Sequence, residues 1–380
     1  MPAVSRPHVL IGTWFYSDQP GFQDFRYRIE TLAHEFDVTL VLRGEEFRRE
    51  FPGLPARIVV LDTPPGRRPM LQFIRRLAAL ARQEQPQLVF LLGSQLAYAA
   101  FLLRGLPSVL YWNEHPTHFF VGSTRRPERL LLGKAMVAAS FAAARRASLV
   151  MPIGEAHRDD LLDHGVPSQR CELVYMGVED RFAGLRGTPA ATPAEPPLEV
   201  VYTGTVSNER GRDVMLEGLA LARREGAQVR LVIVGAAPDQ LAHCRERGAE
   251  LGVADALEVL GRVPGSEIPA FLARADLGVC IWADKVWWRF NPPTKLFEYL
   301  VAGLPVLASR IRTHTAYIRD DFNGLVFDYD ARAFADALLR AWRERARLSA
   351  WSAAAAEDGR RFLWSRIEPQ FLAAVRRAMQ

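Results

Sequence analysis

Residues 291–309 (NPPTKLFEYLVAGLPVLAS) place a cation and a carboxylate near the start of an expected helix. Asn291 is a suitable N-cap, and the prolines after it fit a first helical turn, where a missing N–H costs nothing. Lys295 and Glu298 are three positions apart, so they share one face of the helix. The free N–H groups of a helix N-terminus attract phosphate, and Thr294 lies among them. The segment predicts a site for a nucleotide diphosphate sugar, with a surface Lys–Glu pair as the alternative.

A second candidate phosphate site lies in residues 200–213 (VVYTGTVSNERGRD), which suggest a strand, a glycine turn and a helix beginning near Asp213. Gly204 permits close approach of the backbone at the turn. Arg210 and Arg212 could each present a guanidinium fork to a phosphate. Taken alone, both arginines fit equally well as exposed turn residues.

His115 follows an expected strand, at a position where it could contact a bound sugar. Glu114 and His118 are close enough in the chain to be confused with it. A histidine with a purely structural role is the alternative.

The segment before the expected helix, residues 281–290, is unusually aromatic. Trp282, Trp287 and Trp288 could stack on a sugar or on a lipid-linked acceptor. We favour packing in the core or in a lid for these three side chains.

The elements that must position these residues alternate between short apolar strands and helices along the whole chain. Strands are expected at residues 8–14, 38–43, 56–62, 88–92, 108–112, 148–153, 198–204, 229–235, 256–261, 277–282, 305–309 and 324–328. Apolar strands that alternate with helices are typical of doubly wound parallel sheets covered on both faces. The fold class is therefore α/β.

Two such series indicate two domains, as a length of 380 residues also suggests. We expect an N-terminal domain at 1–178 and, after a Pro- and Gly-rich linker at 179–197, a C-terminal domain at 198–362. A final helix at 363–380 is expected to pack back on the first domain. The carboxyl ends of the two sheets would face a cleft, where ligands of open α/β sheets bind.

Composition narrows the class of protein. An apolar fraction of 49% with 24% charged residues is typical of a soluble globular protein. The three cysteines are widely spaced and follow no metal-ligand pattern, which indicates a reducing compartment and predicts no metal site. A net charge of +5 without a nucleic-acid motif argues against nucleic acid as a partner.

The sequence carries only weak signals for secretion or for membrane attachment. The N-terminus has too short an apolar run for a signal peptide and is expected to begin the first strand. The uncharged stretch 85–103 is marginal in length for a membrane span and is interrupted by Gly93, Ser94 and Gln95. Basic residues flank the apolar helix expected at 130–144, and this pattern is compatible with contact with an anionic membrane surface.

Residues 291–309 resemble the donor-site segment of family 4 glycosyltransferases, in which P-x-K-x-x-E-Y precedes a small-Gly-x-Pro-Val run. Gly204, Arg210 and Gly211 resemble the family's phosphate loop, and further matches follow in the family's order. They are Gly177–Val178, Gly235 with Pro238, and the turn Gly261, Arg262 and Val263. Two positions depart from the pattern: Thr205 stands where an Arg is usual, and Phe290 where a first glutamate is usual.

The resemblance implies a GT-B fold, in which two Rossmann-like domains with parallel sheets face each other across a cleft. It implies transfer of a sugar from a nucleotide diphosphate sugar, of unidentified base, to a glycan, glycolipid or small metabolite. Retention of configuration, independence of metal and no cofactor are also implied. The protein's task would be positioning and stabilisation of the leaving diphosphate.

Roles for individual residues follow from the same resemblance. Arg210 and Lys295 would stabilise the leaving group, Glu298 would accept hydrogen bonds from ribose hydroxyls, and His115 would orient the sugar. The residues expected to line the nucleotide are Gly204, Thr205, Gly235, Arg262, Val263, Asn291 and Thr294. An Ala- and Arg-rich composition suggests a bacterial enzyme of polysaccharide or glycoconjugate biosynthesis, in the cytoplasm or peripheral on the inner face of the membrane.

Three other classes were weighed. A catalytically weak nucleotide-sugar-binding or scaffold subunit is suggested by Thr205 and Phe290. A two-domain solute-binding protein would share the alternating pattern but should carry a signal peptide. A sugar-nucleotide epimerase of the same fold would need acid/base carboxylates at positions where none occurs.

Overall fold

The chain divides into two compact units, Met1–Gly177 with Ile367–Gln380 and Val178–Arg366. Most of the expected linker at 179–197 falls on residues 186–196, outside the described residues. The computed structural model describes residues 6–16, 21–122, 126–185 and 197–380.

The first unit contains a six-stranded sheet of order β3-β2-β1-β4-β5-β6, in which every neighbouring pair is parallel. The strand order reverses between β1 and β4, a topological switch point of the doubly wound kind. The strands are β1 His8–Thr13, β2 Asp37–Leu42, β3 Arg57–Val60, β4 Leu88–Leu92, β5 Ser108–Trp112 and β6 Leu149–Pro152. The helices are α1 Phe22–Glu35, α2 Arg67–Glu84, α3 Pro116–Phe120, α4 Pro127–Ala144 and α5 Glu155–Asp163, with the short 3-10 segments η2 Ser94–Phe101 and η3 Ser168–Arg170.

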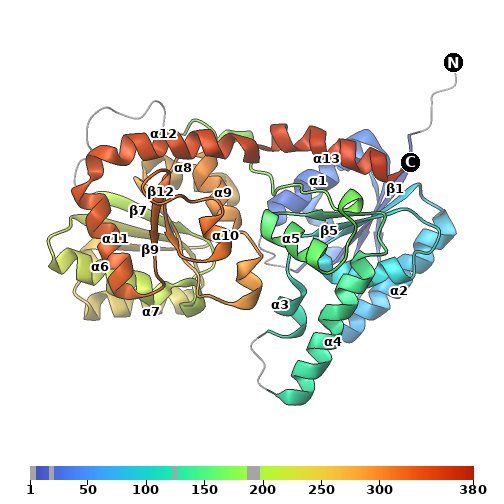
Figure 1. Cartoon of the computed structure of the whole chain (residues 1–380), viewed down its shortest axis with the longest axis horizontal. Coiled ribbons are helices and arrows are strands. Elements are labelled where there is room, and N and C mark those ends of the chain that lie inside the picture. Colours follow the sequence, from blue (N-terminus) through green and yellow to red (C-terminus); the bar gives the residue numbers. More distant parts are fainter. Residues whose placement is uncertain (1–5, 17–20, 123–125, 186–196) are drawn as a thin grey trace. The chain divides into compact units, whose positions relative to one another are not determined.

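Both faces of this sheet are covered, which is why its strands are almost continuously apolar. Val89 and Leu91 belong to the core cluster formed with α2, η2 and α4. Phe90 points to the opposite face, where its ring lies 5.7 Å from that of Phe371 on α13 (Trp364–Ala378). In Figure 1 the sheet of this unit accordingly lies between helices.

The second unit repeats the plan, with a six-stranded parallel sheet of order β12-β11-β10-β7-β8-β9. Its order reverses between β7 and β10. The strands are β7 Leu198–Thr203, β8 Val229–Ala236, β9 Leu257–Gly261, β10 Leu277–Cys280, β11 Val306–Ser309 and β12 Gly324–Phe327. The main helices are α6 Arg212–Arg224, α7 Pro238–Glu250, α8 Ile268–Arg274, α9 Thr294–Val301, α11 Ala331–Arg343 and α12 Leu348–Gly359.

The expected α/β class and the two parallel, Rossmann-like sheets are confirmed, and all twelve expected strands occur. The helix α13 packs within the first unit through a Thr31–Glu368 hydrogen bond of 2.6 Å and an Arg376–Glu35 ion pair of 2.5 Å. Among the described residues, no helix combines the length and apolarity that crossing a bilayer requires.

Candidate functional site

Lys295 is a buried cation near the N-terminus of α9, in the second unit. Only 7% of the residue is exposed, and its Nζ lies 3.4 Å from the ring centroid of Tyr202 on β7. Within the described part of the chain, Nζ has no hydrogen-bond partner. A buried ammonium that has an aromatic ring beside it but no hydrogen-bond acceptor is unfavourable, so this arrangement favours an anion at Nζ.

The pKa of Lys295 is lowered to about 7, chiefly by burial. The positive charge of Arg210 lowers it further, while Cys280 and Glu298 act in the opposite direction. An anion bound at Nζ would favour the charged form and raise this pKa.

Gly204, at the carboxyl end of β7, allows a ligand to approach Lys295. Its φ of 109° lies in a region that L side chains rarely adopt, and a Cβ at this position would lie 3.4 Å from the Lys295 Nζ. Gly235, near the end of β8, has a φ of 113°, and a Cβ there would lie 2.6 Å from the Gly204 carbonyl oxygen. Gly204 is therefore exposed backbone beside the ammonium, and Gly235 is needed because the Gly204 backbone occupies the space that a side chain would fill.

Arg210 is the second cation near Lys295. It ends the short segment η5 (Asn208–Arg210), is half-buried, and its guanidinium carbon lies 5.5 Å from the ring centroid of Trp282. Arg212, the other candidate, donates to Asp213 at 2.8 and 3.1 Å, so its guanidinium is already paired. The geometry thus favours Arg210 as the second phosphate ligand.

Glu298 lies one turn further along α9 and is half-buried. Its pKa is raised to about 7, mainly by burial; the charge of Lys295 opposes that rise and the charge of Glu179 adds to it. Its carboxyl group is therefore partly protonated near neutral pH and can both donate and accept hydrogen bonds.

The start of α9 differs from the sequence expectation. The helix begins at Thr294 with Pro293 as its N-cap residue, so Asn291 does not cap it. A residue before proline is disfavoured in the α region, and the consecutive prolines 292 and 293 hold residues 291 and 292 out of the helix. Asn291 is 6% exposed in the preceding turn, and Thr294 is half-buried.

The remaining nucleotide candidates lie on loops at the same carboxyl edge of the sheet. Thr205 follows β7, is exposed, and its carbonyl oxygen accepts from the Tyr202 hydroxyl at 2.7 Å. Arg262 and Val263 follow β9 and are exposed and half-buried, respectively. The structure places Gly204 against both Lys295 and Gly235, and Arg210 is near enough to Lys295 to lower its pKa.

His115 belongs to the first unit, where it performs a capping role. Its Nδ1 accepts from the Thr117 N–H at 3.3 Å at the start of α3, and its Nε2 lies 3.2 Å from an Asp160 carboxylate oxygen. Only 4% of the residue is exposed. In the structure described, both ring nitrogens are thus engaged by residues of its own unit.

Sequence reasoning missed Tyr202, whose ring supports the Lys295 ammonium as a cation–π partner. The feature of the sequence that could have identified Tyr202 is its position at the end of a strand, next to Thr203 and Gly204. Trp282, Trp287 and Trp288 form a buried cluster with Ile311, which confirms the packing interpretation. Trp282 also contacts Arg210 and so helps to position it.

Two family models match the sequence. One, described as "Glycosyl transferases group 1", matches residues 197–344, and the other, "Glycosyltransferase Family 4", matches residues 28–182. A comparison with curated proteins found no match.

Several solved structures share the fold along the whole chain. HepE of Anabaena in complex with UDP-glucose is 16% identical, with a TM-score of 0.74 over 98% of this chain and 100% of that one. A sucrose-phosphate synthase from Thermosynechococcus elongatus is 17% identical, with a TM-score of 0.74 over 98% and 99% of the two chains. WaaG, a glycosyltransferase of lipopolysaccharide biosynthesis, is 16% identical, with a TM-score of 0.73 over 96% and 99%.

Proposed function

The chain belongs to the GT-B glycosyltransferases of the family 4 type, and from this premise we propose that it transfers a sugar from a nucleotide diphosphate sugar to an acceptor hydroxyl. The observation that carries the proposal is the buried Lys295 ammonium, which lies beside Gly204 and has no hydrogen-bond partner among the described residues. A diphosphate is the anion whose charge and size suit Lys295 and Arg210 together.

We propose uridine as the base. HepE, whose fold and length this chain shares, was solved with UDP and with UDP-glucose. Thr205, Arg262 and Val263, on the loops after β7 and β9, are the residues we expect near the base and ribose.

In the proposed reaction the bond between the anomeric carbon and the β-phosphate oxygen breaks, and a bond from that carbon to the acceptor oxygen forms on the same face. The acceptor proton passes to the departing diphosphate, which accounts for retention without a general base. Lys295 and Arg210 neutralise the charge that develops on the diphosphate, so no metal is required in this scheme. Glu298 holds the ribose hydroxyls. His115, which is buried and contacts Thr117 and Asp160, acts by positioning the start of α3.

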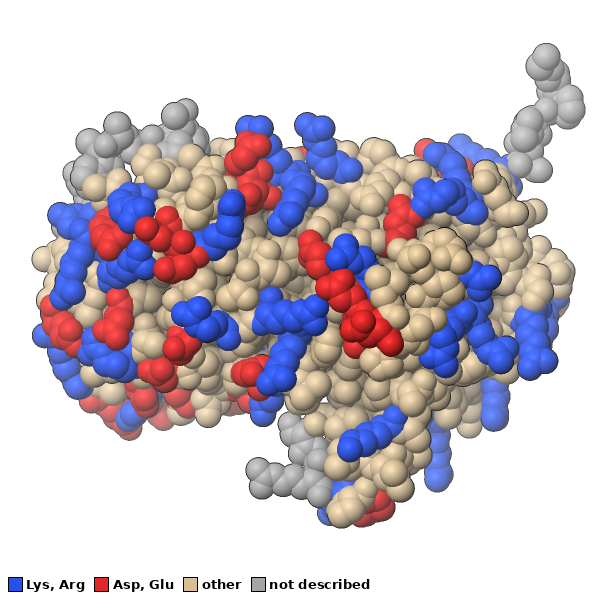
Figure 2. Space-filling model, viewed as in Figure 1, with Lys and Arg blue, Asp and Glu red and all other residues tan. Residues whose placement is uncertain are grey.

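We place the acceptor among glycans, glycolipids and small metabolites of a bacterial cytoplasm, with peripheral contact with the inner face of an anionic membrane. The observation that supports membrane contact is on α4, where Leu131 and Leu132 are 73% and 58% exposed near Arg129 and Lys134. Over α2 and α4, Lys and Arg side chains outnumber Asp and Glu (Figure 2). An apolar helix face beside basic residues is suited to anionic lipid.

Calorimetric titration with UDP, GDP, ADP and TDP, with and without divalent metal, tests the donor site. We expect metal-independent binding of UDP in the wild type and loss of that binding in Lys295→Ala. Absence of binding to all four nucleotides would overturn the proposal.

A non-catalytic scaffold subunit is the second candidate, because Phe290 replaces a carboxylate and Thr205 replaces a cation at positions where related enzymes carry them. The two candidates differ in turnover. An enzyme releases UDP from UDP-sugar in the presence of acceptor, whereas a scaffold binds UDP-sugar and leaves it intact.

A further inference from the structure

A strongly basic hollow lies in the first unit, at the amino ends of β5 and β6. Its volume is about 670 Å³, within the range of small-molecule sites. Parallel αβ sheets bind their usual ligands at the carboxyl ends of the strands. This hollow is at the opposite edge of the sheet and is thus separate from the region where a donor or an acceptor is expected.

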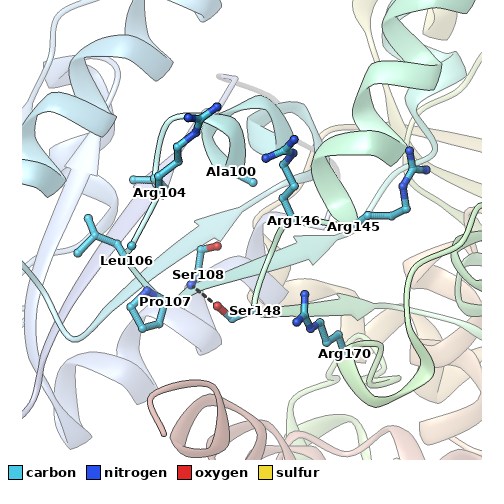
Figure 3. Close-up of a pocket in the computed structure, with 11 residues that line it drawn as sticks. Ala100, Arg104, Leu106, Pro107, Ser108, Arg145, Arg146, Ser148 and Arg170 are labelled. Carbon is cyan, nitrogen blue, oxygen red and sulfur yellow. Dashed lines mark hydrogen bonds between the residues drawn. The ribbon is translucent and has the colours of Figure 1, made fainter.

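Four arginines from four places in the chain surround it. Arg104 is in the turn before β5, Arg145 and Arg146 follow α4, and Arg170 ends η3 (Figure 3). Between them lie Ser108 and Ser148, joined by a hydrogen bond of 3.1 Å from the Ser108 N–H to the Ser148 hydroxyl. Of the described residues that line the hollow, none is Asp or Glu.

Among the described residues, the arginines around this hollow lack carboxylate partners. Within the described residues, none of the four arginines forms an ion pair, whereas surface arginines elsewhere commonly do. Arg145 donates to the His164 carbonyl oxygen at 2.8 Å, and the Arg146 guanidinium lies 5.4 Å from the ring centroid of Phe101. Two guanidinium groups are therefore held in place, although four like charges around one hollow repel each other.

The net charge of the surrounding sequence is also strongly positive. Residues 67–146 contain twelve Lys and Arg and three Asp and Glu, a net charge of +9, while the whole chain has a net charge of +5. The rest of the chain is therefore net negative, and positive charge is concentrated around this part of the first unit.

From these observations we propose that the hollow is a binding site for a phosphate group carrying about two negative charges, separate from the donor site. Guanidinium groups match phosphate oxygens with paired N–H donors, and the Ser148 hydroxyl adds a polar group beside them. The phosphate can belong to a soluble phosphorylated molecule or to a lipid headgroup, and the experiment below distinguishes the two sources.

The test for a soluble ligand is calorimetric titration of inorganic pyrophosphate in the presence of saturating UDP, so that the donor site is filled. The variant is Arg104→Ala/Arg170→Ala, because within the described residues neither side chain forms a hydrogen bond, ion pair or ring contact, so their removal should not disturb folding. A matched control, Arg224→Ala/Arg245→Ala, removes the same charge from exposed positions of the second unit that form no ion pair with any described residue. We expect saturable binding in the wild type and the control, weakened at least about tenfold in the variant.

The test for a lipid source is sedimentation with phosphatidylcholine vesicles that contain either phosphatidic acid or an equal charge of phosphatidylserine. The variant Arg104→Lys/Arg170→Lys keeps the net charge but loses the paired donors. A lipid headgroup site predicts preference for phosphatidic acid in the wild type and loss of that preference in the Lys variant. The proposal is overturned if pyrophosphate does not bind in the presence of UDP and the two kinds of vesicle bind wild type and variants alike.

Discussion

At the scale of single residues, Lys295 couples the donor site to pH. In the ligand-free protein its pKa is lowered to about 7, so about half of the ammonium is neutral at neutral pH. A bound diphosphate favours the charged form, so the pKa rises and a proton is taken up on binding. The affinity for the diphosphate is therefore highest below pH 7. It declines as the pH rises from 7 toward the pKa that Lys295 has in the complex.

The measurement is the dissociation constant of UDP-glucose from about pH 6.5 to 8.5, because its diphosphate has no ionisation of its own in that range. We expect affinity to fall by up to about tenfold per pH unit above pH 7. Lys295→Arg keeps the charge throughout this range and should show a flatter profile. Any slope that remains in Lys295→Arg belongs to Glu298, and equal slopes in the two proteins would contradict the assignment.

Glu298 is predicted to act in binding the donor and not in holding the fold. Its side chain is half-buried, and its raised pKa reports a burial cost that Lys295 only partly offsets. We expect Glu298→Ala to lower turnover at least about a hundredfold, because the donor loses a positioning contact. The melting temperature should stay within a few degrees of the wild type, and unchanged product formation would remove Glu298 from the site.

At the scale of elements, α4 is predicted to supply the membrane contact. Leu131 and Leu132 are the two most exposed of the large hydrophobic side chains in the described residues. Since each Leu withdrawn from water contributes about 1.5–3 kcal/mol, Leu131→Ser/Leu132→Ser should reduce partitioning to phosphatidylglycerol vesicles at least tenfold.

Leu162→Ser is the control, because Leu162 is an exposed leucine on α5 and lies outside α4. It should bind the vesicles like the wild type. Partitioning that is independent of Leu131 and Leu132, or equal on neutral and anionic vesicles, would contradict a role for α4.

Comparison of the predicted and observed strands and helices shows where prediction from the sequence succeeds. Strands such as β4 and β5 are predictable because runs of four or five apolar residues, bounded by turn residues, have few other solutions in an α/β chain. The start of α9 was placed too early, because Asn291 is a good N-cap locally while the preference of residues before proline overrides it. The role of His115 in capping α3 depends on Thr117 and on Asp160, which is 45 positions away, so no local pattern could reveal it.

The same limit holds for the donor site. The spacing of Lys295 and Glu298 shows that they share a helix face, but the cation–π contact with Tyr202 depends on how α9 packs against β7. Proximity of Gly204 and Gly235 depends on the pairing of β7 with β8, which the sequence does not specify residue by residue. The residue types of the donor site can be predicted from the sequence. The distances between these residues depend on how the strands pair in the sheet.

At the scale of the whole molecule, a buried ion pair connects segments that are far apart in the chain. Arg28 on α1 donates to the Asp24 carboxylate at 3.0 and 3.1 Å, and the Gly177 N–H donates to the same carboxylate at 2.9 Å. The Tyr111 hydroxyl, on β5, also donates to Asp24. The Arg28 guanidinium lies 5.0 Å from the ring centroid of Phe371, so the C-terminal helix packs on the same group.

We predict that Asp24→Ala lowers the free energy of unfolding of the first unit by about 3–5 kcal/mol, because it leaves the Arg28 charge buried without a counter-ion. Guanidinium denaturation followed by circular dichroism, with the protein saturated with UDP, measures the loss separately from the second unit. The double variant Asp24→Ala/Arg28→Met removes the charge as well as its partner and should recover much of the stability. If the double variant is as unstable as Asp24→Ala, the lost stability arises from the hydrogen bonds of Gly177 and Tyr111 to Asp24. The main role of the carboxylate is then to fix the backbone at Gly177, where the chain leaves the first unit.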